Sequence, residues 1–437
     1  MILRFSVRNY LSFDEEQEIS FVASKLRDRD DGLIDLGHVS SGLKGLPVAA
    51  VYGANASGKS NLLRALFKMR DLVLFSHRSG GPGDGIKRKF YALRDDCERE
   101  ETKFSIDFVM NNIRYHYGFS FNDELYQEEW LYSYPEGSRR LLFERTARKP
   151  IKFGSSFKGE KKVFESLMRD NSLFVSVAAQ NNHDILGEVF KFFQDLVAEL
   201  DVSGARGLHQ IKRDRSEVDD RLLKFLALVG TGIVSYRKKK TVQSPESVRF
   251  REKFISLITE ELNDGSEGEF SNVMRSSWEK EELEFGHQGE RQGLIYFDIS
   301  EESAGTQKII GVLSQVFSVL DEGGFISVDE IDVSVHSQVT EAIFALFLNK
   351  VTNPNGAQLL ATTHDTNLMS SKVLRRDEIW LVEKNQTGMS ELFPLTDIRT
   401  RKQDNIEKGY LEGRYGAVPM VDIPDLVAEV GCGAEKS

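Results

Sequence analysis

Alternating apolar and polar residues predict strands in the first third of the chain. The first ten residues alternate in this way and lack the unbroken apolar run that a signal peptide needs. Residues 103–121 alternate on both sides of Asn111 and Asn112, so we expect a β-hairpin there. A third strand is expected around residues 130–134, and together these strands predict an antiparallel sheet.

Unbroken apolar runs predict a second sheet that is buried on both faces. Residues 46–52 and 324–328 are short runs of this kind, and residues 358–364 form another that ends in polar residues. The apolar spacing in residues 61–67 and 309–317 is that of helices. Because the carboxyl ends of parallel strands meet at one edge, the polar residues that follow such strands are expected where ligands of open α/β sheets bind.

The middle of the chain has the pattern of helices. Residues 184–200, 216–229 and 246–263 carry apolar residues at three- and four-residue spacing, and none sustains heptads long enough for a coiled-coil arm. The predicted fold class is α/β. The predicted segments are an N-terminal lobe over 1–135, a mainly helical insertion over 136–290 and a C-terminal lobe over 291–437.

Composition and charge narrow the function classes. The 437 residues carry 57 Lys and Arg against 68 Asp and Glu, and the net charge of −11 argues against a protein that coats nucleic acid with its whole surface. Two cysteines supply neither a disulfide framework nor a metal knuckle, which suits a reducing cytosol. No window approaches 18 consecutive apolar residues, so we expect a cytoplasmic protein without a membrane segment.

The strongest chemical signal is the run from Gly53 to Ser60, which reads G-x-x-x-x-G-K-S between a predicted strand and a predicted helix. Glycines let backbone N–H groups close around phosphate oxygens, and the new helix points its positive end at them. Lys59 would reach the phosphates, and the Ser60 hydroxyl would bind Mg²⁺. The residues expected to bind the nucleotide here are Gly53, Asn55, Ser57, Gly58, Lys59, Ser60 and Asn61.

Two acids follow the apolar run 324–328. Asp329 would hold the Mg²⁺ shell, and Glu330 is placed to orient or deprotonate an attacking water. A purely structural acid at a strand end is the alternative, because many buried strands end in this way.

Two further segments could contact a ligand. Ser303, Gly305, Thr306 and Gln307 form a small, hydroxyl-rich turn before the helix at 309–317, which is either an anion site or an ordinary helix N-cap. His364 ends the predicted strand 358–364, and its place at a strand end favours a catalytic role over a structural one.

In this order the four segments resemble the ABC-type ATPases of the RecF/SMC/OLD branch. The resemblance identifies a Walker A loop at 53–60, a signature loop at 303–308, Walker B acids at 329–330, a D-loop at 331–334 and a switch histidine, His364. It implies a P-loop ATPase head with a flanking antiparallel sheet, in which two protomers sandwich ATP and Mg²⁺ head to tail. Lys59, Glu330 and His364 would be catalytic, and the signature residues and Asp332 would also contact nucleotide.

The sequence departs from the family pattern in two places. The usual signature is Leu-Ser-Gly-Gly-Gln, whereas this chain has Thr306 at the second glycine. The Q-loop glutamine is not identifiable, because residues 90–93, where it should follow, contain no Gln.

A narrower resemblance is to the AAA_15-type ATPases of bacterial abortive-infection systems, the AbiL/RloA group, to which PARIS-type ATPase subunits are related. Residues 8–13, 171–180, 361–367 and 397–419 carry it. It implies a homo-oligomeric ATPase that works in antiphage defence beside a separately encoded, nuclease- or Toprim-like effector. The 73 residues after His364 contain no Asp-x-Asp pair, so an intrinsic nuclease is not expected.

The main alternative is a RecF-like DNA-repair ATPase that clamps duplex DNA when ATP closes the dimer. Basic residues cluster at 212–215 and 237–240, and a third stretch at 145–162 is mixed with glycine and serine. These clusters are either solvated loops and helix ends or a nucleic-acid groove. A monomeric P-loop kinase is disfavoured, because it has no use for the Ser303 and His364 segments. The tail 424–437 either docks on a partner or frays.

Overall fold

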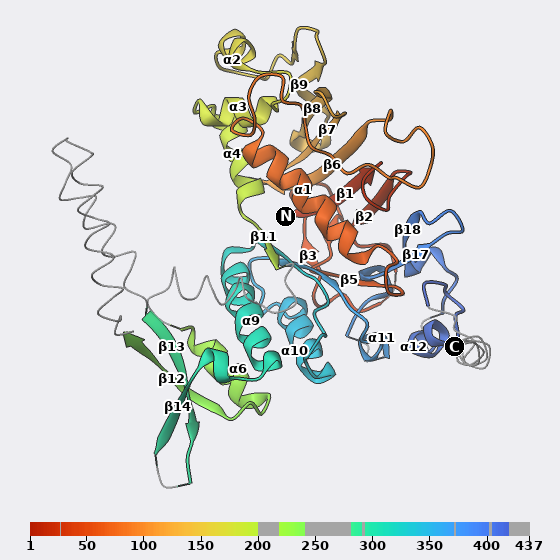
Figure 1. The fold of residues 1–437 in the computed structure, drawn as a ribbon. Helices are drawn as coiled ribbons and strands as arrows, with labels where there is room; N and C mark the ends of the chain where they lie inside the picture. Colours follow the sequence, from red (N-terminus) through yellow and green to blue (C-terminus); the bar gives the residue numbers. More distant parts are fainter. Residues whose placement is uncertain are drawn as a thin grey trace, which may run out of the picture. The chain divides into compact units, whose positions relative to one another are not determined.

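The computed structural model describes residues 1–26, 28–199, 218–240, 281–290, 293–370, 373–401 and 404–418 (Figure 1). The chain forms two compact units. The first comprises Met1–Leu200 and Ser318–Ser437, and the second comprises Asp201–Phe317. Among the described residues, no helix combines the length and the apolar character needed to cross a membrane.

One sheet of the first unit is antiparallel and has seven strands in the order β10-β9-β8-β7-β6-β1-β2. The turn between β6 and β7 places Asn111 and Asn112 at φ 50° and 61°, as a type I′ hairpin requires. The predicted hairpin, the third strand and the N-terminal strand are confirmed. The strands are β1 (Ile2–Arg8), β2 (Gln17–Ser20), β6 (Thr102–Met110), β7 (Ile113–Phe121), β8 (Tyr126–Tyr134), β9 (Arg140–Thr146) and β10 (Lys152–Phe153).

The second sheet of this unit has six strands in the order β11-β15-β16-β5-β17-β18, and only β18 runs antiparallel to its neighbour. Its central strands are fully buried, which explains their unbroken apolar sequences. The three predicted parallel strands are confirmed. The strands are β5 (Val48–Tyr52), β11 (Leu196–Glu199), β15 (Phe325–Val328), β16 (Gln358–Thr362), β17 (Ile379–Lys384) and β18 (Ser390–Pro394).

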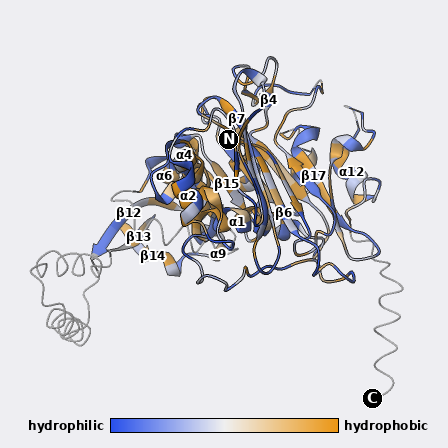
Figure 2. Cartoon of the chain, turned by 90° about the horizontal axis from the view of Figure 1, so that it is seen from above, coloured by the Kyte–Doolittle hydropathy of each residue, from blue (hydrophilic) through white to orange (hydrophobic). Residues whose placement is uncertain are grey.

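Helix α1 (Lys59–Phe75) joins the cores of the two sheets. Its apolar face, including Leu62, Leu66 and Val73, belongs to one cluster with aromatic residues of β6 and β7 and with apolar residues of β5 and β15. Apolar residues accordingly concentrate on the strands and on α1, while the outer loops are hydrophilic (Figure 2). Gln358 also ties the sheets together, because its side chain bonds the backbone N–H and C=O of Ile2 and the C=O of Leu46.

Shorter elements complete the first unit. Helices α3 and α4 cover the aromatic inner face of the antiparallel sheet together with α1. The remaining elements are β3 (Ile34–Asp35), β4 (Lys44–Gly45), η1 (Pro135–Gly137), α2 (Lys161–Leu167), α3 (Phe174–Gln180), α4 (Asp184–Gln194), α10 (Ser337–Leu348), α11 (Asn367–Ser370), η3 (Arg376–Glu378), η4 (Leu395–Asp397) and α12 (Ile406–Leu411).

The second unit contains a three-stranded antiparallel sheet in the order β12-β13-β14. Leu222 and Leu226 of α6 are buried, as are Ile233 of β12 and Phe285 of β13. The elements are α6 (Asp220–Leu228), β12 (Ile233–Lys240), β13 (Glu281–Gln288), β14 (Leu294–Asp298) and η2 (Ile299–Glu301), and α9 (Ala304–Glu322) begins in this unit.

The expectation of a helical middle is only partly met. The helix predicted at 184–200 ends at Gln194, because the next residues form β11 and pair in parallel with β15. The helix predicted at 216–229 is present as α6, whereas the one at 246–263 lies outside the described residues. Strands β9, β10, β12 and β13 also fall within the segment that was expected to be mainly helical. The division into three segments stays a prediction.

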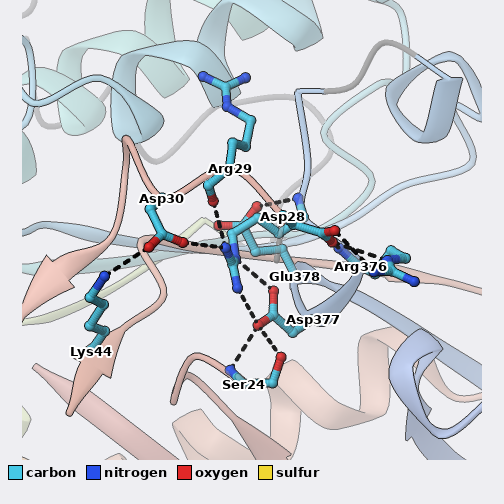
Figure 3. A network of polar contacts seen from close by, with 9 residues as sticks. Ser24, Asp28, Arg29, Asp30, Lys44, Arg376, Asp377 and Glu378 are labelled. Atoms are coloured by element: carbon cyan, nitrogen blue, oxygen red, sulfur yellow. Dashed lines mark hydrogen bonds and ion pairs between the residues drawn. The ribbon is translucent and has the colours of Figure 1, made fainter. Parts of the chain in front are cut away.

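A network of charged residues, buried at Arg375 and Asp377, holds the entry to β17 against the N-terminal segment (Figure 3). Arg375, which is 3% exposed, bonds both carboxylate oxygens of Asp377 and also Asp30. Asp377 in turn accepts hydrogen bonds from Ser24, and Arg376 pairs with Asp28. Removing one member of such a network leaves an unpaired buried charge, so its parts stabilise the fold only together.

In this region, burial disfavours the ionised form of the Glu378 carboxyl group. It is fully buried, and burial raises its pKa from 4.5 to about 8. A group whose pKa is higher in the folded state than in the unfolded state stabilises the fold most at pH values below its unfolded-state pKa. This contribution is lost as the pH rises toward its folded-state pKa. We expect the free energy of unfolding to fall between pH 4.5 and 8 by up to about 1.4 kcal/mol per pH unit from this residue. Glu378→Gln should flatten that slope in denaturant titrations, and an unchanged slope would contradict the assignment.

Candidate functional site

The loop between β5 and α1 is shaped by two glycines. A Cβ atom added to Gly53 would lie 2.3 Å from the carbonyl oxygen of Val382, and one added to Gly58 would lie 2.2 Å from Oγ of Ser390. Gly58 also has a φ of 119°, which side chains other than glycine rarely adopt. Helix α1 begins at Lys59, so its first N–H groups, which have no partner within the helix, are available to an anion held by the loop.

Lys59 lies over this loop. Its Nζ atom donates to the carbonyl oxygens of Gly53, at 2.9 Å, and of Ala54, at 3.1 Å, and the residue is only 6% exposed. Burial lowers the pKa of Lys59, and the nearby charges of Glu330 and Asp329 oppose that shift. The ammonium group is therefore held inside this glycine loop and close to the two acids.

The Thr362 hydroxyl connects the two acidic residues at the end of β15. It donates to Oδ1 of Asp329 at 2.6 Å and accepts from the backbone N–H of Glu330 at 2.7 Å. The hydroxyl of Ser60 donates to the same Asp329 oxygen at 3.1 Å. One carboxylate thus receives hydrogen bonds from the start of α1 and from the end of β16.

The pairing of Ser60 with Asp329 fits a divalent cation. A hydroxyl and a carboxylate are oxygen ligands of the kind that Mg²⁺ prefers, and Mg²⁺ commonly keeps only one or two protein ligands beside waters and substrate phosphates. Ser60 and Asp329 would hold the ion, which when bound would neutralise phosphate charge.

The backbone turns sharply at Glu330. This residue has a φ of 47°, in the left-handed region that non-glycine residues seldom occupy. Such conformations cluster at functional sites, where surrounding bonds hold them in place. Here the hydrogen bond from the Glu330 N–H to the Thr362 hydroxyl holds this backbone conformation in place. The chain therefore turns immediately after Asp329.

His364 and Asp332 lie at the same edge. The N–H of His364 donates to both carboxylate oxygens of Asp332, each at 3.2 Å, so the predicted D-loop and the end of β16 are joined. Burial lowers the pKa of His364, and the positive charge of Lys59 lowers it further. The imidazole is therefore neutral over a wider pH range than a free histidine and can accept a proton or a hydrogen bond.

The remaining predicted residues of the loop differ in their surroundings. Asn55 is exposed, whereas Ser57 is buried with a hydroxyl that has no hydrogen-bond partner among the described residues. Asn61 donates to the Ser12 hydroxyl, and the Ser390 hydroxyl donates to the carbonyl of Ser57. The sequence analysis assigned no role to Ser12, Thr362 or Ser390, although Ser12 and Thr362 lie within runs that carry the family resemblance.

The predicted signature turn lies in the second unit and is described there by itself. The Ser303 hydroxyl accepts from the N–H of Thr306 at 3.1 Å and lies 2.9 Å from the Thr306 hydroxyl. Gln307 donates to the carbonyl of Glu302. This is the geometry of the helix N-cap that the sequence left open as an alternative. A contact of Ser303, Gly305, Thr306 or Gln307 with nucleotide stays a prediction.

The basic cluster 237–240 lies on a strand rather than beside a helix. Arg237 and Lys239 of β12 both pair with Glu284 of β13, which is buried between them. Part of the positive charge is therefore neutralised within the sheet. In the stretch 145–162, Arg145 is likewise buried and paired with Glu129. The cluster 212–215 lies outside the described residues.

Comparisons with known proteins identify the family of the chain. The profile of the family described as "AAA domain, putative AbiEii toxin, Type IV TA system" matches residues 48–370, which is well over half of the chain. No curated protein matched the sequence.

Two of the similar solved structures are heads of SMC proteins. An SmcHead bound to the C-winged helix domain of ScpA is 14% identical, with 91% of this chain and 99% of that chain covered and a TM-score of 0.35. An Smc head domain with a coiled coil and joint derived from Pyrococcus yayanosii is 12% identical, with 90% and 96% covered and a TM-score of 0.32. Similarity this low identifies neither the activity nor the partners of this chain.

The Thr362 hydroxyl provides a test of how the site is held. Thr362→Val removes a buried donor and acceptor, so the free energy of unfolding should fall by about 1–3 kcal/mol. Thr362→Ser keeps the hydroxyl, so this variant should retain most of the parental free energy of unfolding. Thr340→Val is the matched control, because the buried Thr340 hydroxyl has no partner among the described residues. Equal losses for Thr362→Val and Thr340→Val in denaturant unfolding would contradict the bonds at Thr362.

Proposed function

The chain belongs to this AbiEii-type AAA domain family, and on that premise we propose that it binds and hydrolyses ATP with Mg²⁺ and thereby controls a separately encoded effector in bacterial antiphage defence. Membership makes it an ATPase-family protein. Hydrolysis, the dimer and the defence role are the proposal. The narrower AbiL/RloA assignment stays a prediction.

The observation that carries the proposal is the convergence of four side chains at one sheet edge. Lys59 lies in a glycine loop, Ser60 bonds Asp329, and Thr362 fixes both Asp329 and the turn at Glu330. A cation site beside a phosphate loop, with a second carboxylate next to it, is what hydrolysis of a nucleoside triphosphate requires. A site that only bound an anion would have no need of the acids.

The proposed reaction assigns one role to each group. The loop N–H groups and Lys59 would bind the β- and γ-phosphates. Glu330 would orient a water molecule and accept its proton as the new bond to the γ-phosphorus forms and the bond to the β–γ bridging oxygen breaks, giving ADP and phosphate. His364, kept neutral near Lys59, would donate or accept a hydrogen bond at the γ-phosphate.

The proposed dimer follows from the family resemblance of the sequence. Two protomers would sandwich ATP, with Ser303 and Gly305 of one opposite Lys59 of the other. The exposed position of Ser303 at the start of α9 is compatible with such a contact. ATP binding would then change the protein surface that is available to an effector.

The defence role is supported by the family description, which reads "putative AbiEii toxin, Type IV TA system", and by the sequence runs that resemble abortive-infection ATPases. The effector is expected to be a nuclease- or Toprim-like protein. Nucleic acid is kept as a candidate partner. The repair alternative shares every nucleotide residue, and Glu284 neutralises only part of the positive charge of the cluster 237–240.

Lys59→Ala tests nucleotide binding. Losing a charge-assisted contact to phosphate should weaken ATP affinity by about a hundredfold, measured by titration calorimetry. Lys152→Ala is the control, because that side chain is 72% exposed and pairs only with Glu144 among the residues described. Unchanged affinity in Lys59→Ala would refute the site.

The same variant tests the defence role in cells. Bacteria that carry this gene with its native neighbours should plate phage less efficiently than bacteria that carry the Lys59→Ala version. Equal plating across a broad phage panel would argue against ATP-dependent defence.

Glu330→Gln tests catalysis and the dimer together. The amide cannot accept the proton from water, so turnover should fall at least about a hundredfold while ATP stays bound. Light scattering after gel filtration should then show a stable dimer with ATP and a monomer without it. A monomer that retains ATP would overturn the sandwich, and parental turnover would overturn the role of Glu330.

A further inference from the structure

The run near residue 410 that carries the narrower resemblance is not explained by the nucleotide site itself. In the structure, residues 404–418 form one compact piece, here named the C-terminal clamp: helix α12, then a tight turn through Gly413 and Gly416. The clamp packs at the carboxyl edge of the six-stranded sheet, where β5 leads into the phosphate loop.

The unusual composition of the clamp has a packing explanation. A Cβ atom added to Gly409 would lie 2.5 Å from the Tyr415 ring, so only glycine leaves room for that ring. The Tyr410 hydroxyl donates to the carbonyl of Ala417, and the N–H of Ala417 donates to Glu383 at the end of β17. Tyr410 and Tyr415 are 6% and 7% exposed, so the clamp has its own small core.

The clamp also touches the loop that carries the predicted switch histidine, residues 363–367, here named the switch loop. The Thr366 hydroxyl donates to Oε1 of Glu407 in α12 at 3.0 Å. Beneath it, the Tyr410 ring meets the Tyr52 ring edge to face at 6.0 Å, and the Tyr52 hydroxyl donates to the carbonyl of Asp365.

The switch loop is therefore held from two sides. On one side His364 is joined to Asp332 of the D-loop, and on the other Thr366 is joined to Glu407 of the clamp. Asp365 between them is buried, and its Oδ2 atom has no hydrogen-bond partner among the described residues. A loop with one unsatisfied buried oxygen depends on the bonds at its ends to stay in place.

We propose that Glu407 is a positioning residue for ATP hydrolysis: through Thr366 the C-terminal clamp holds the switch loop so that His364 faces the nucleotide, without touching nucleotide itself. The inference rests on the proposed ATPase function. This role would explain why the clamp contacts three segments: β5, the switch loop and the end of β17. Any protein that displaces α12 would thereby slow the ATPase.

The test compares variants that remove the Thr366–Glu407 bond with variants that keep it. Thr366→Val and Glu407→Ala remove the donor or the acceptor, and each should lower kcat about fivefold while KM for ATP stays within a factor of two. Thr366→Ser and Glu407→Gln keep the donor and the acceptor and should restore kcat. The double variant should be no slower than either single variant, because both delete one bond.

Lys408→Ala is the matched control. It lies beside Glu407 in the same helix, with a side chain 68% exposed and an ion pair to Glu412 on the surface. Its kcat should equal that of the parent. A loss of the same size in Lys408→Ala would show that kcat follows general disturbance of α12, and the positioning role would be rejected.

Hydrogen exchange separates failure of this inference from failure of the proposed function. Amides of residues 363–367 should exchange faster in Thr366→Val and Glu407→Ala, while those of 59–66 keep the parental rate. If the parent chain does not hydrolyse ATP, the proposed function fails, yet exchange still reports on the clamp. Unchanged exchange would refute the clamp, and faster exchange with parental kcat would refute positioning.

Discussion

The site depends on the parallel pairing of β5, β15 and β16. Val328 of β15 pairs with Ala361 of β16, and Thr362 of β16 pairs with Val51 of β5, so the three strands end within two residue steps of one another. That register brings the Thr362 hydroxyl within 2.6 Å of Asp329. A shift by one residue would turn each side chain to the opposite face and separate the loop at Lys59 from Asp329 and Glu330.

The buried charges of the first unit show a common arrangement. Glu129 accepts bonds from two backbone N–H groups at the start of α3 and from Tyr117, and Arg145 neutralises it. Burial still raises the pKa of Glu129. Like the network around Arg375, this pair contributes specificity of packing more than net stability, because desolvation offsets much of the attraction.

Sequence reasoning succeeded where a pattern is local. The strand–loop–helix around Lys59, the Asn111–Asn112 hairpin and the strand ending at Asp329 each follow from a few neighbouring residues. Sequence reasoning failed where pairing with a strand far away in the chain determines the secondary structure. Residues 196–199 were expected to be helical but pair with β15, and the cluster at Arg237 is a strand because β13, over forty residues later, pairs with it. The role of Thr362 was invisible for the same reason, since only the register places its hydroxyl at Asp329.

The side-chain amide of Gln358 has a mechanical consequence. It fastens the first residue of β16 to β1 of the antiparallel sheet, while the other end of β16 carries Thr362 and leads into His364. Strand β16, five residues long, is thus a direct covalent connection between the antiparallel sheet and the predicted switch histidine. A displacement of the antiparallel sheet would be transmitted along β16 to the sheet edge that carries Thr362, with no loop in between to absorb it.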